Sequence, residues 1–229
     1  MTEPGLVYTW KDDPYSSHRV ALDWITALPP ETRILDIGCA QGLLGARLER
    51  NPQRLVGVEP NPLWAAQAAQ YYGRVINQPF EALADETLAG YDLVVMLDVL
   101  EHMAEPETAL RRVRRVLPPD GRLILSVPNV AHLYVRLNLL AGRFEYQERG
   151  ILDRTHLKFF TRASITRLAQ RCGFRIVRES ATPVPLPLVH PFFERARLGR
   201  GLHAFNAWSA RLWPALLGYQ ILLLAESEK

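Results

Sequence analysis

Short apolar runs alternate with amphipathic helical patterns from the start of the chain to residue 127. Five of these runs have the length and composition of buried strands, at 33–37, 54–59, 74–77, 91–97 and 121–127. Helical patterns lie between them, at 18–28, 42–50, 62–72 and 106–116. Strands that alternate with helices are typical of a parallel sheet covered on both faces. We therefore predict an α/β architecture.

The alternation ends after residue 127. An irregular insert at 128–160 begins with an amphipathic pattern over 130–141, and a second insert at 181–217 contains five prolines and four arginines. Between the inserts, Thr161 and Gly173 have the residue types of a helix N-cap and a helix stop, and a strand is predicted at 174–179. The last strand is predicted at 219–226.

Inserts of this length usually cover a functional site when they follow the carboxyl ends of strands. The sequence contains no internal repeat and no linker long enough to divide it. We therefore predict one domain over 1–229, with cap-like inserts at 128–160 and 181–217.

Composition narrows the class of protein. The 229 residues are 48% hydrophobic, which suits one sizeable core, and the net charge of +3 is too small to predict nucleic-acid binding. Cys39 and Cys172 fit neither a disulfide framework nor paired zinc ligands, so we expect a reducing compartment. The first 13 residues lack a signal-peptide pattern, and the apolar run 212–225 is too short to span a membrane. We expect a cytoplasmic protein without a transmembrane segment.

A loop of small residues follows the first predicted strand directly. It reads Gly38-Cys39-Ala40-Gln41-Gly42, and Glu59 ends the second strand 21 residues after Gly38. In open parallel sheets this turn borders the crevice where ligands bind, and N–H groups at the start of the helix predicted at 42–50 would favour an anionic group. A carboxylate at Glu59 can accept hydrogen bonds from both hydroxyls of a ribose.

Two other interpretations of this loop stay open. The glycines can form a merely structural turn, with Glu59 a surface acid. A nucleotide-linked oxidoreductase is the alternative enzyme class, although its loop needs a small residue at the sixth position, where this chain has Leu43.

Four segments resemble motifs of class I S-adenosylmethionine-dependent methyltransferases, in the same order along the chain. Residues 34–42 resemble the first motif, 58–60 the second and 91–102 the fourth, and 117–123 is similar to the turn before the fifth strand. The resemblance implies a Rossmann-like seven-stranded sheet, mostly parallel with an antiparallel last strand. It also implies helices on both faces, helical inserts after strands 5 and 6, and S-adenosylmethionine as the cofactor.

The resemblance also implies a set of cofactor-binding positions, with residues 36–42 around the methionyl part and Glu59 on the ribose. The implied residues are Asp36, Gly38, Cys39, Ala40, Gly42, Glu59, Pro60, Phe80, Glu81, Asp98 and Val99. Two positions depart from the family pattern. Ala40 replaces the usual second glycine, which predicts an ordinary negative φ there. Pro79 stands where the family has an aspartate that reaches the adenine amine, so Phe80 and Glu81 are the candidates for that contact.

The second half of the chain is similar to a methyltransferase group often encoded with glycan-assembly enzymes. The likeness rests on 126–129, 137–146, 150–161 and the pair Tyr219-Gln220. This association predicts O-methylation of a saccharide or a similar small-molecule hydroxyl. A module that binds the cofactor without turnover is the non-enzymatic alternative. The sequence does not predict an oligomeric state.

Three polar residues follow the fourth predicted strand. Asp98, Glu101 and His102 have the i, i+3, i+4 spacing that places side chains on one face of a helical turn. The pattern resembles the acid-x-x-Glu-His sequence of ubiquinone-pathway and small-RNA 2′-O-methyltransferases, in which a divalent metal sits near the acceptor hydroxyl. His156 is a candidate to join them from the first insert. Glu101, His102 and His156 are the catalytic candidates, and these three with Asp98 are the metal candidates.

Structural roles for the same residues stay open. Asp98 and Glu101 have the spacing of a capping box, and His102 is able to bond a backbone group. His156 as a buried, hydrogen-bonded histidine is as well supported as His156 as a general base. The insert at 181–217 combines arginines with aromatic residues, which is compatible with peripheral contact to a membrane, a helical lid or a dimer face.

Overall fold

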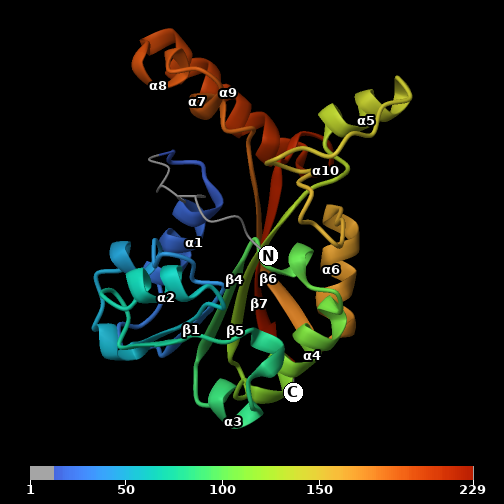
Figure 1. The fold of residues 1–229 in the computed structure, drawn as a ribbon. Coiled ribbons are helices and arrows are strands. Elements are labelled where there is room, and N and C mark those ends of the chain that lie inside the picture. The colour runs from blue at the N-terminus through green and yellow to red at the C-terminus, as the bar shows by residue number, and fades with distance from the viewer. Residues whose placement is uncertain (1–12, 229) are drawn as a thin grey trace.

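A computed structural model describes residues 13–228, and in this part of the chain seven strands form one mixed sheet in the order β3-β2-β1-β4-β5-β7-β6 (Figure 1). The strands are β1 (Ile34–Ile37), β2 (Leu55–Val58), β3 (Arg74–Ile76), β4 (Leu93–Leu97), β5 (Arg122–Pro128), β6 (Phe174–Thr182) and β7 (Gln220–Ser227). Strand β7 runs antiparallel to both of its neighbours, β5 and β6. The predicted mostly parallel sheet with a reversed last strand is therefore confirmed. Residues 1–13 were expected to lack a targeting signal; of these, 1–12 lie outside the described residues.

Apolar residues on both faces explain the central position of β1 and β4. Every residue of β1 and β4 is buried, and β1 pairs in parallel with β2 on one side and with β4 on the other. A parallel strand covered on both faces needs an almost continuous apolar run, which is the pattern that predicted these strands. The single polar residue of β1, Asp36, is buried with the rest.

Helices cover both faces of the sheet, as predicted. The helices are α1 (Ser17–Thr26), α2 (Pro62–Ala68), α3 (Asp85–Leu88), α4 (Pro106–Val116), α5 (Leu133–Leu140), α6 (Arg162–Arg171), α7 (Leu186–Val189), α8 (Phe192–Arg195), α9 (Arg197–Leu212) and α10 (Pro214–Leu217). Trp24 of α1 and Ala68 of α2 pack into one core cluster. Leu88 of α3, Leu110 of α4 and Ile165 of α6 pack into the other, on the opposite side of the sheet in Figure 1.

The helix predicted at 42–50 is wrong. That segment consists of turns and one short 3-10 helix at Gly45–Arg47. Gly42 has φ +81°, outside the right-handed helical region, and Gly45 packs beneath the ring of Tyr72, where a Cβ would lie 2.5 Å from Tyr72 Cε2. The ring therefore holds this segment close to the sheet, and no α-helix begins directly after the glycine loop.

The two inserts form separate arms beyond the carboxyl end of the parallel strands. Helix α5 leads the first arm and α7 to α9 form the second (Figure 1). Between them, α6 begins with the predicted N-cap at Thr161, which forms a capping box with Ser164, and Gly173 follows its end with φ +85°. Within residues 13–228, no helix has the length and apolar character needed to cross a bilayer.

Candidate functional site

The loop after β1 is held by the acid at the end of β2. Gly38, Ala40 and Gly42 have φ values of +73°, +46° and +81°. The negative φ predicted for Ala40 is therefore wrong. Glu59 Oε2 accepts a hydrogen bond from the Ala40 N–H at 3.0 Å, and its Oε1 accepts one from the Asn61 N–H at 2.8 Å. The bond to Ala40 offsets the strain that a left-handed conformation costs an alanine, about 1–2 kcal/mol.

The N–H groups of this loop are mostly used inside the chain. Those of Gly38 and Cys39 both donate to Val58 O, at 2.8 and 3.2 Å, and that of Gly42 donates to Cys39 O at 2.9 Å. With the Ala40 bond to the carboxylate, four of the five loop amides have partners, which differs from the open row of N–H groups that a helix start would give. The carboxylate keeps lone pairs for two further donors, as binding to ribose hydroxyls requires.

Close packing explains why two loop positions are glycine. A Cβ at Gly38 would lie 2.6 Å from Val99 Cγ2, and a Cβ at Gly42 would lie 2.9 Å from the Cα of Ala68 in α2. Val99 follows β4, so the structure brings the carboxyl ends of β1 and β4 together at this loop. These residues and Glu59 therefore meet at the carboxyl edge of the sheet, the edge at which parallel sheets bind ligands.

Two of the side chains implied for the methionyl part face the protein interior. Asp36 accepts a hydrogen bond from the Tyr72 hydroxyl. Burial raises the pKa of Asp36 to about 7; the Tyr72 bond acts in the opposite direction, and the charge of Glu59 adds to the rise. Burial also raises the pKa of the Cys39 thiol, which packs against Gly57. Contact of Asp36 and Cys39 with a cofactor stays a prediction.

The two candidates for the adenine contact differ in solvent exposure. Phe80 is in the core, with the Arg112 guanidinium 5.1 Å from the centroid of its ring. Glu81 is exposed, and so is Pro60, whose carbonyl accepts a hydrogen bond from Asn77 at 3.0 Å. Of the two candidates, Glu81 is thus the one whose side chain faces solvent.

Asp98 directly follows β4 and is hydrogen-bonded to side chains of β5 and β7. Its Oδ1 accepts a hydrogen bond from Ser126 Oγ in β5 at 2.6 Å, and its Oδ2 accepts one from Gln220 Nε2 in β7 at 2.7 Å. Sequence reasoning missed both partners as site residues, because nothing in the local pattern connects positions 122 residues apart. Only the resemblance at Tyr219-Gln220 pointed to this part of β7.

The predicted helical face of Asp98, Glu101 and His102 is wrong. Asp98 has φ +56°, and the 3-10 helix covers only Leu100–His102, with Val99 at its N-cap and no side-chain cap. The capping-box alternative for Asp98 is therefore wrong as well. Both carboxylate oxygens of Asp98 are bound to β5 and β7, and Asp98 is not among the residues whose ligand atoms gather within 4.8 Å of one another, which include Glu101 and His102.

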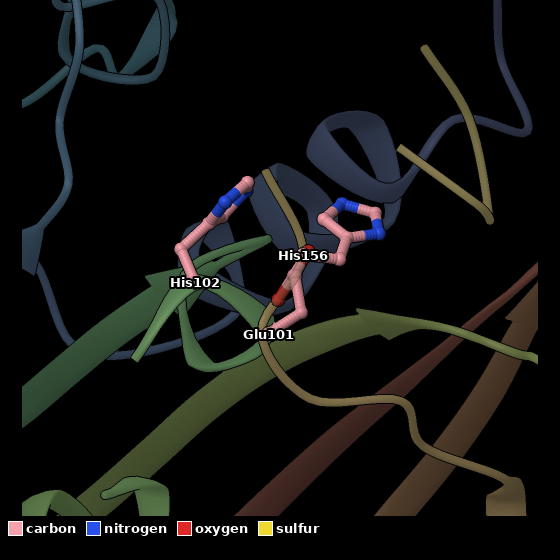
Figure 2. Close-up of side chains that lie close together, drawn as sticks. All are labelled: Glu101, His102 and His156. Atoms are coloured by element: carbon pink, nitrogen blue, oxygen red, sulfur yellow. The ribbon is translucent and has the colours of Figure 1, made fainter. Parts of the chain in front are cut away.

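That cluster consists of Glu101, His102 and His156, and each of the three offers a ligand atom within 4.8 Å of the others. The Glu101 carboxylate lies beside the two imidazole rings (Figure 2), which contact each other edge to face with their centroids 4.9 Å apart. Glu101 is 1% exposed, and neither of its carboxylate oxygens has a hydrogen-bond partner among the described residues. The N–H groups of Leu157 and Lys158 donate to the Glu101 carbonyl at 2.8 and 3.0 Å, which fixes the His156 loop over it. Burial raises the pKa of Glu101 well above its usual value, with a contribution from the charge of Asp98.

Both histidines are oriented by backbone carbonyls. His102 Nδ1 lies 3.2 Å from Thr155 O, and His156 Nδ1 lies 3.0 Å from Ile151 O. A carbonyl only accepts, so each Nδ1 carries the proton and each neutral ring keeps its Nε2 lone pair. These bonds match the structural alternative for His102, and they are also the support that metal-ligating histidines usually have. Burial lowers the pKa of His156, which favours its neutral ring.

A shallow cavity of about 510 Å³, widely open to solvent, adjoins the cluster. It is lined by Tyr146, Arg154, His156 and Leu157, all from the first insert. This insert therefore supplies a histidine to the cluster and the wall of the space beside it.

Comparisons with known proteins give the family and the fold. A family model described as a methyltransferase domain matches residues 15–179. A ubiquinone biosynthesis O-methyltransferase from Aeromonas salmonicida (strain A449) is 30% identical over 184 residues, which cover 76% of each chain.

Solved structures share the fold. Magnesium protoporphyrin IX methyltransferase from Synechocystis PCC 6803, with bound S-adenosylhomocysteine, has a TM-score of 0.59 at 18% identity, over 93% of this chain and 84% of that one. A methyltransferase from Thermotoga maritima described as S-adenosylmethionine-dependent has a TM-score of 0.57 at 19% identity, over 93% and 91%. With the family match over residues 15–179, the chain belongs to the methyltransferase domain family and is an S-adenosylmethionine-dependent methyltransferase of the Rossmann-like class I fold.

Proposed function

We propose that this enzyme transfers the methyl group of S-adenosylmethionine to a hydroxyl oxygen of a small-molecule acceptor bound beside Glu101, His102 and His156. We further propose that these three residues hold a divalent cation. One observation carries the proposal: a buried carboxylate without a hydrogen-bond partner among the described residues lies within 4.8 Å of ligand atoms of two histidines whose Nε2 lone pairs are available.

A buried, unpartnered carboxylate needs a counterion or a proton. Leaving it charged costs several kcal/mol. The histidines cannot supply hydrogen bonds from Nε2 while they are neutral, since their protons are on Nδ1. A carboxylate with two imidazoles suits ions such as Mn²⁺ or Zn²⁺. Bound there, such an ion would lower the pKa of an acceptor hydroxyl and so generate the nucleophile.

The chain's own residues position the reactants. Glu59 is buried directly after β2 and accepts hydrogen bonds from the ribose hydroxyls. The loop at 38–42 lies along the methionyl part of the cofactor. Asp98 and Val99 connect the glycine loop, against which Val99 packs at Gly38, to the Glu101 cluster within three residues of chain. Methyl transfer is an in-line displacement, so holding donor and acceptor oxygen collinear supplies much of the acceleration.

The acceptor class is the finer part of this proposal. The likeness at 126–161 predicts a saccharide, whereas the relative from Aeromonas salmonicida is named for ubiquinone biosynthesis. Tyr146 and Leu157 on the cavity wall favour an acceptor with a flat, partly apolar ring. Screening sugar nucleotides, glycan fragments and catechols with a labelled methyl donor separates these classes: a labelled sugar supports the first and a labelled phenol the second.

Two measurements test the alternatives. Calorimetric titration should detect binding of S-adenosylmethionine and not of NAD; NAD binding alone would support an oxidoreductase. Formation of S-adenosylhomocysteine during incubation with cell extract should occur, and its absence with every acceptor tried would support a non-catalytic module.

The cation is tested with Glu101→Gln, which keeps the shape of the side chain and removes its charge. Mn²⁺ should raise the melting temperature of the wild type and EDTA should abolish turnover, whereas Glu101→Gln should lose both the Mn²⁺ response and turnover. The exposed Glu105→Gln is the matched control and should behave as the wild type. Cofactor affinity should be unchanged in both variants. Full turnover in EDTA, or an unchanged Mn²⁺ response in Glu101→Gln, would refute the metal site.

A further inference from the structure

The outward face of α9 is apolar, and its inward face carries small residues. Its exposed apolar side chains are Leu198, Leu202, Phe205, Trp208 and Leu212. Its buried residues are Gly199, His203, Ala207 and Ala210. Both sets recur every three or four residues, so each forms one stripe along the 16-residue helix. An ordinary surface helix points its large apolar stripe toward the core, and here the arrangement is reversed.

The inward face is fixed in place by specific contacts. His203 Nε2 lies 3.0 Å from Asp13 Oδ1, and both side chains are almost fully buried. Asn206 Nδ2 donates to Val184 O at 2.9 Å. Rotating the helix to bury its apolar stripe would break these contacts, so the apolar stripe faces outward in the folded protein.

Neighbouring segments enlarge the apolar surface. Leu188 and Val189 of α7 are 61% and 69% exposed, and Trp213, which follows α9, is 62% exposed. The rings of Phe205 and Trp208 stack at 5.5 Å. We call the surface formed by residues 188–213 of α7, α8 and α9 the α9 arm. It stands away from the sheet in Figure 1.

The α9 arm also accounts for the net charge of the protein. Residues 188–213 contain four arginines and one glutamate, a net charge of +3, and the rest of the chain has 23 basic and 23 acidic residues. None of these four arginines forms an ion pair with a carboxylate within residues 13–228. The spacing of Arg197, Arg200 and Arg211 places them on one flank of the apolar stripe.

We propose that the α9 arm binds the surface of an anionic lipid membrane. Exposed aromatic and leucine side chains beside a flank of arginines form the pattern of a helix that lies in the plane of a membrane interface. Each arginine near such a surface contributes attraction to lipid phosphates. A symmetric contact with a second copy would instead bring two +3 segments together, which disfavours it. The proposal does not depend on the methyl acceptor or on the metal site.

Flotation with vesicles tests the proposal. The full-length protein should float with phosphatidylcholine–phosphatidylglycerol vesicles, bind pure phosphatidylcholine far less, and be released at about 1 M salt. Leu198→Ser combined with Phe205→Ser should weaken binding at least tenfold, and Arg197→Gln about fivefold. Both changes are at exposed positions, so thermal unfolding should stay as in the wild type.

Matched controls lie on other helices. Leu63 of α2 is 66% exposed, close to the 69% of Leu198, and Arg167 of α6 is exposed like Arg197. Leu63→Ser and Arg167→Gln should bind vesicles as the wild type does. The proposal is overturned if the wild type does not bind anionic vesicles, or if the α9 variants bind as well as the controls. It is equally overturned if Leu198→Ser with Phe205→Ser converts a solution dimer to monomer without affecting vesicles, since the arm then faces a second copy.

Discussion

Glu59 accepts a hydrogen bond from the N–H of Ala40, at 3.0 Å, and so closes the glycine loop with the same carboxylate that is proposed to bind the ribose. The acid therefore has two functions that depend on each other. Its bonds to the loop fix where its remaining lone pairs point, and the loop conformation depends on its charge.

Replacing Glu59 with glutamine should weaken S-adenosylmethionine binding about 10- to 100-fold. The amide has one acceptor oxygen in place of two, so it cannot bond Ala40, Asn61 and two ribose hydroxyls together. Isothermal titration calorimetry measures the loss. The exposed Glu86→Gln should bind the cofactor normally, and an equally small effect of both changes would contradict the ribose contact.

Gly38→Ala should lower the free energy of unfolding by about 2–4 kcal/mol, because the residue has φ +73° and its Cβ would lie 2.6 Å from Val99 Cγ2. Urea unfolding measures the change. Gly201→Ala in α9 is the control, because nothing lies within 4 Å of its Cβ position; it should stabilise by up to about 1 kcal/mol. Adding Val99→Ala to Gly38→Ala should recover part of the loss; no recovery would mean that the clash is unimportant.

Asp98→Asn tests whether Asp98 belongs to the proposed metal ligands at Glu101, His102 and His156. The change replaces one of the two acceptor oxygens with an NH2 group, so Ser126 or Gln220 loses its acceptor and stability should fall by about 1–3 kcal/mol. The Mn²⁺ response in thermal unfolding should persist, because Asp98 lies outside the Glu101 cluster. Loss of that response in a folded Asp98→Asn protein would return Asp98 to the metal-ligand set.

The buried carboxyl of Asp36 should make the apoprotein less stable as pH rises. Its pKa is raised from 3.8 to about 7, so between these values the folded protein holds a proton that the unfolded chain has released. The contribution of Asp36 to the free energy of unfolding is thus fully present below pH 3.8 and is lost as pH rises to about 7. Asp36→Asn keeps an acceptor for Tyr72 and removes the titration.

The free energies of unfolding of the wild type and Asp36→Asn should therefore diverge as pH rises. The variant should gain up to roughly 4 kcal/mol relative to the wild type across this window. Urea unfolding at several pH values measures the difference. Parallel curves for the two proteins would contradict a raised pKa at Asp36.

The strands were predictable because their burial on both faces requires continuous apolar runs, and the predicted and observed bounds differ by three residues at most. The conformation of Ala40 was not, because its positive φ depends on a bond to Glu59 that no local pattern encodes. The helix predicted at 42–50 was wrong for a similar reason. Its apolar residues have helical spacing, but packing of Tyr72 on Gly45 favours another conformation.

The Glu101 cluster was predictable in part. Adjacent Glu101 and His102 indicated chemistry, and His156 was named as a candidate from the insert. The burial of Glu101 was not predictable, since it results from the 150–158 loop lying over the end of β4. The place of Asp98 depended on Gln220, which comes from the other end of the chain.

The order of strands also has a consequence for synthesis of the protein. Strand β7 is the last described element to leave the ribosome, yet it lies between β5 and β6. Until it emerges, β6 has no strand beside it and Asp98 lacks its amide partner. The pairing of β5 and β6 with β7 therefore forms only after β7 has been translated. Until then the nascent chain exposes the unpaired edges of β5 and β6, which are the kind of surface that chaperones protect.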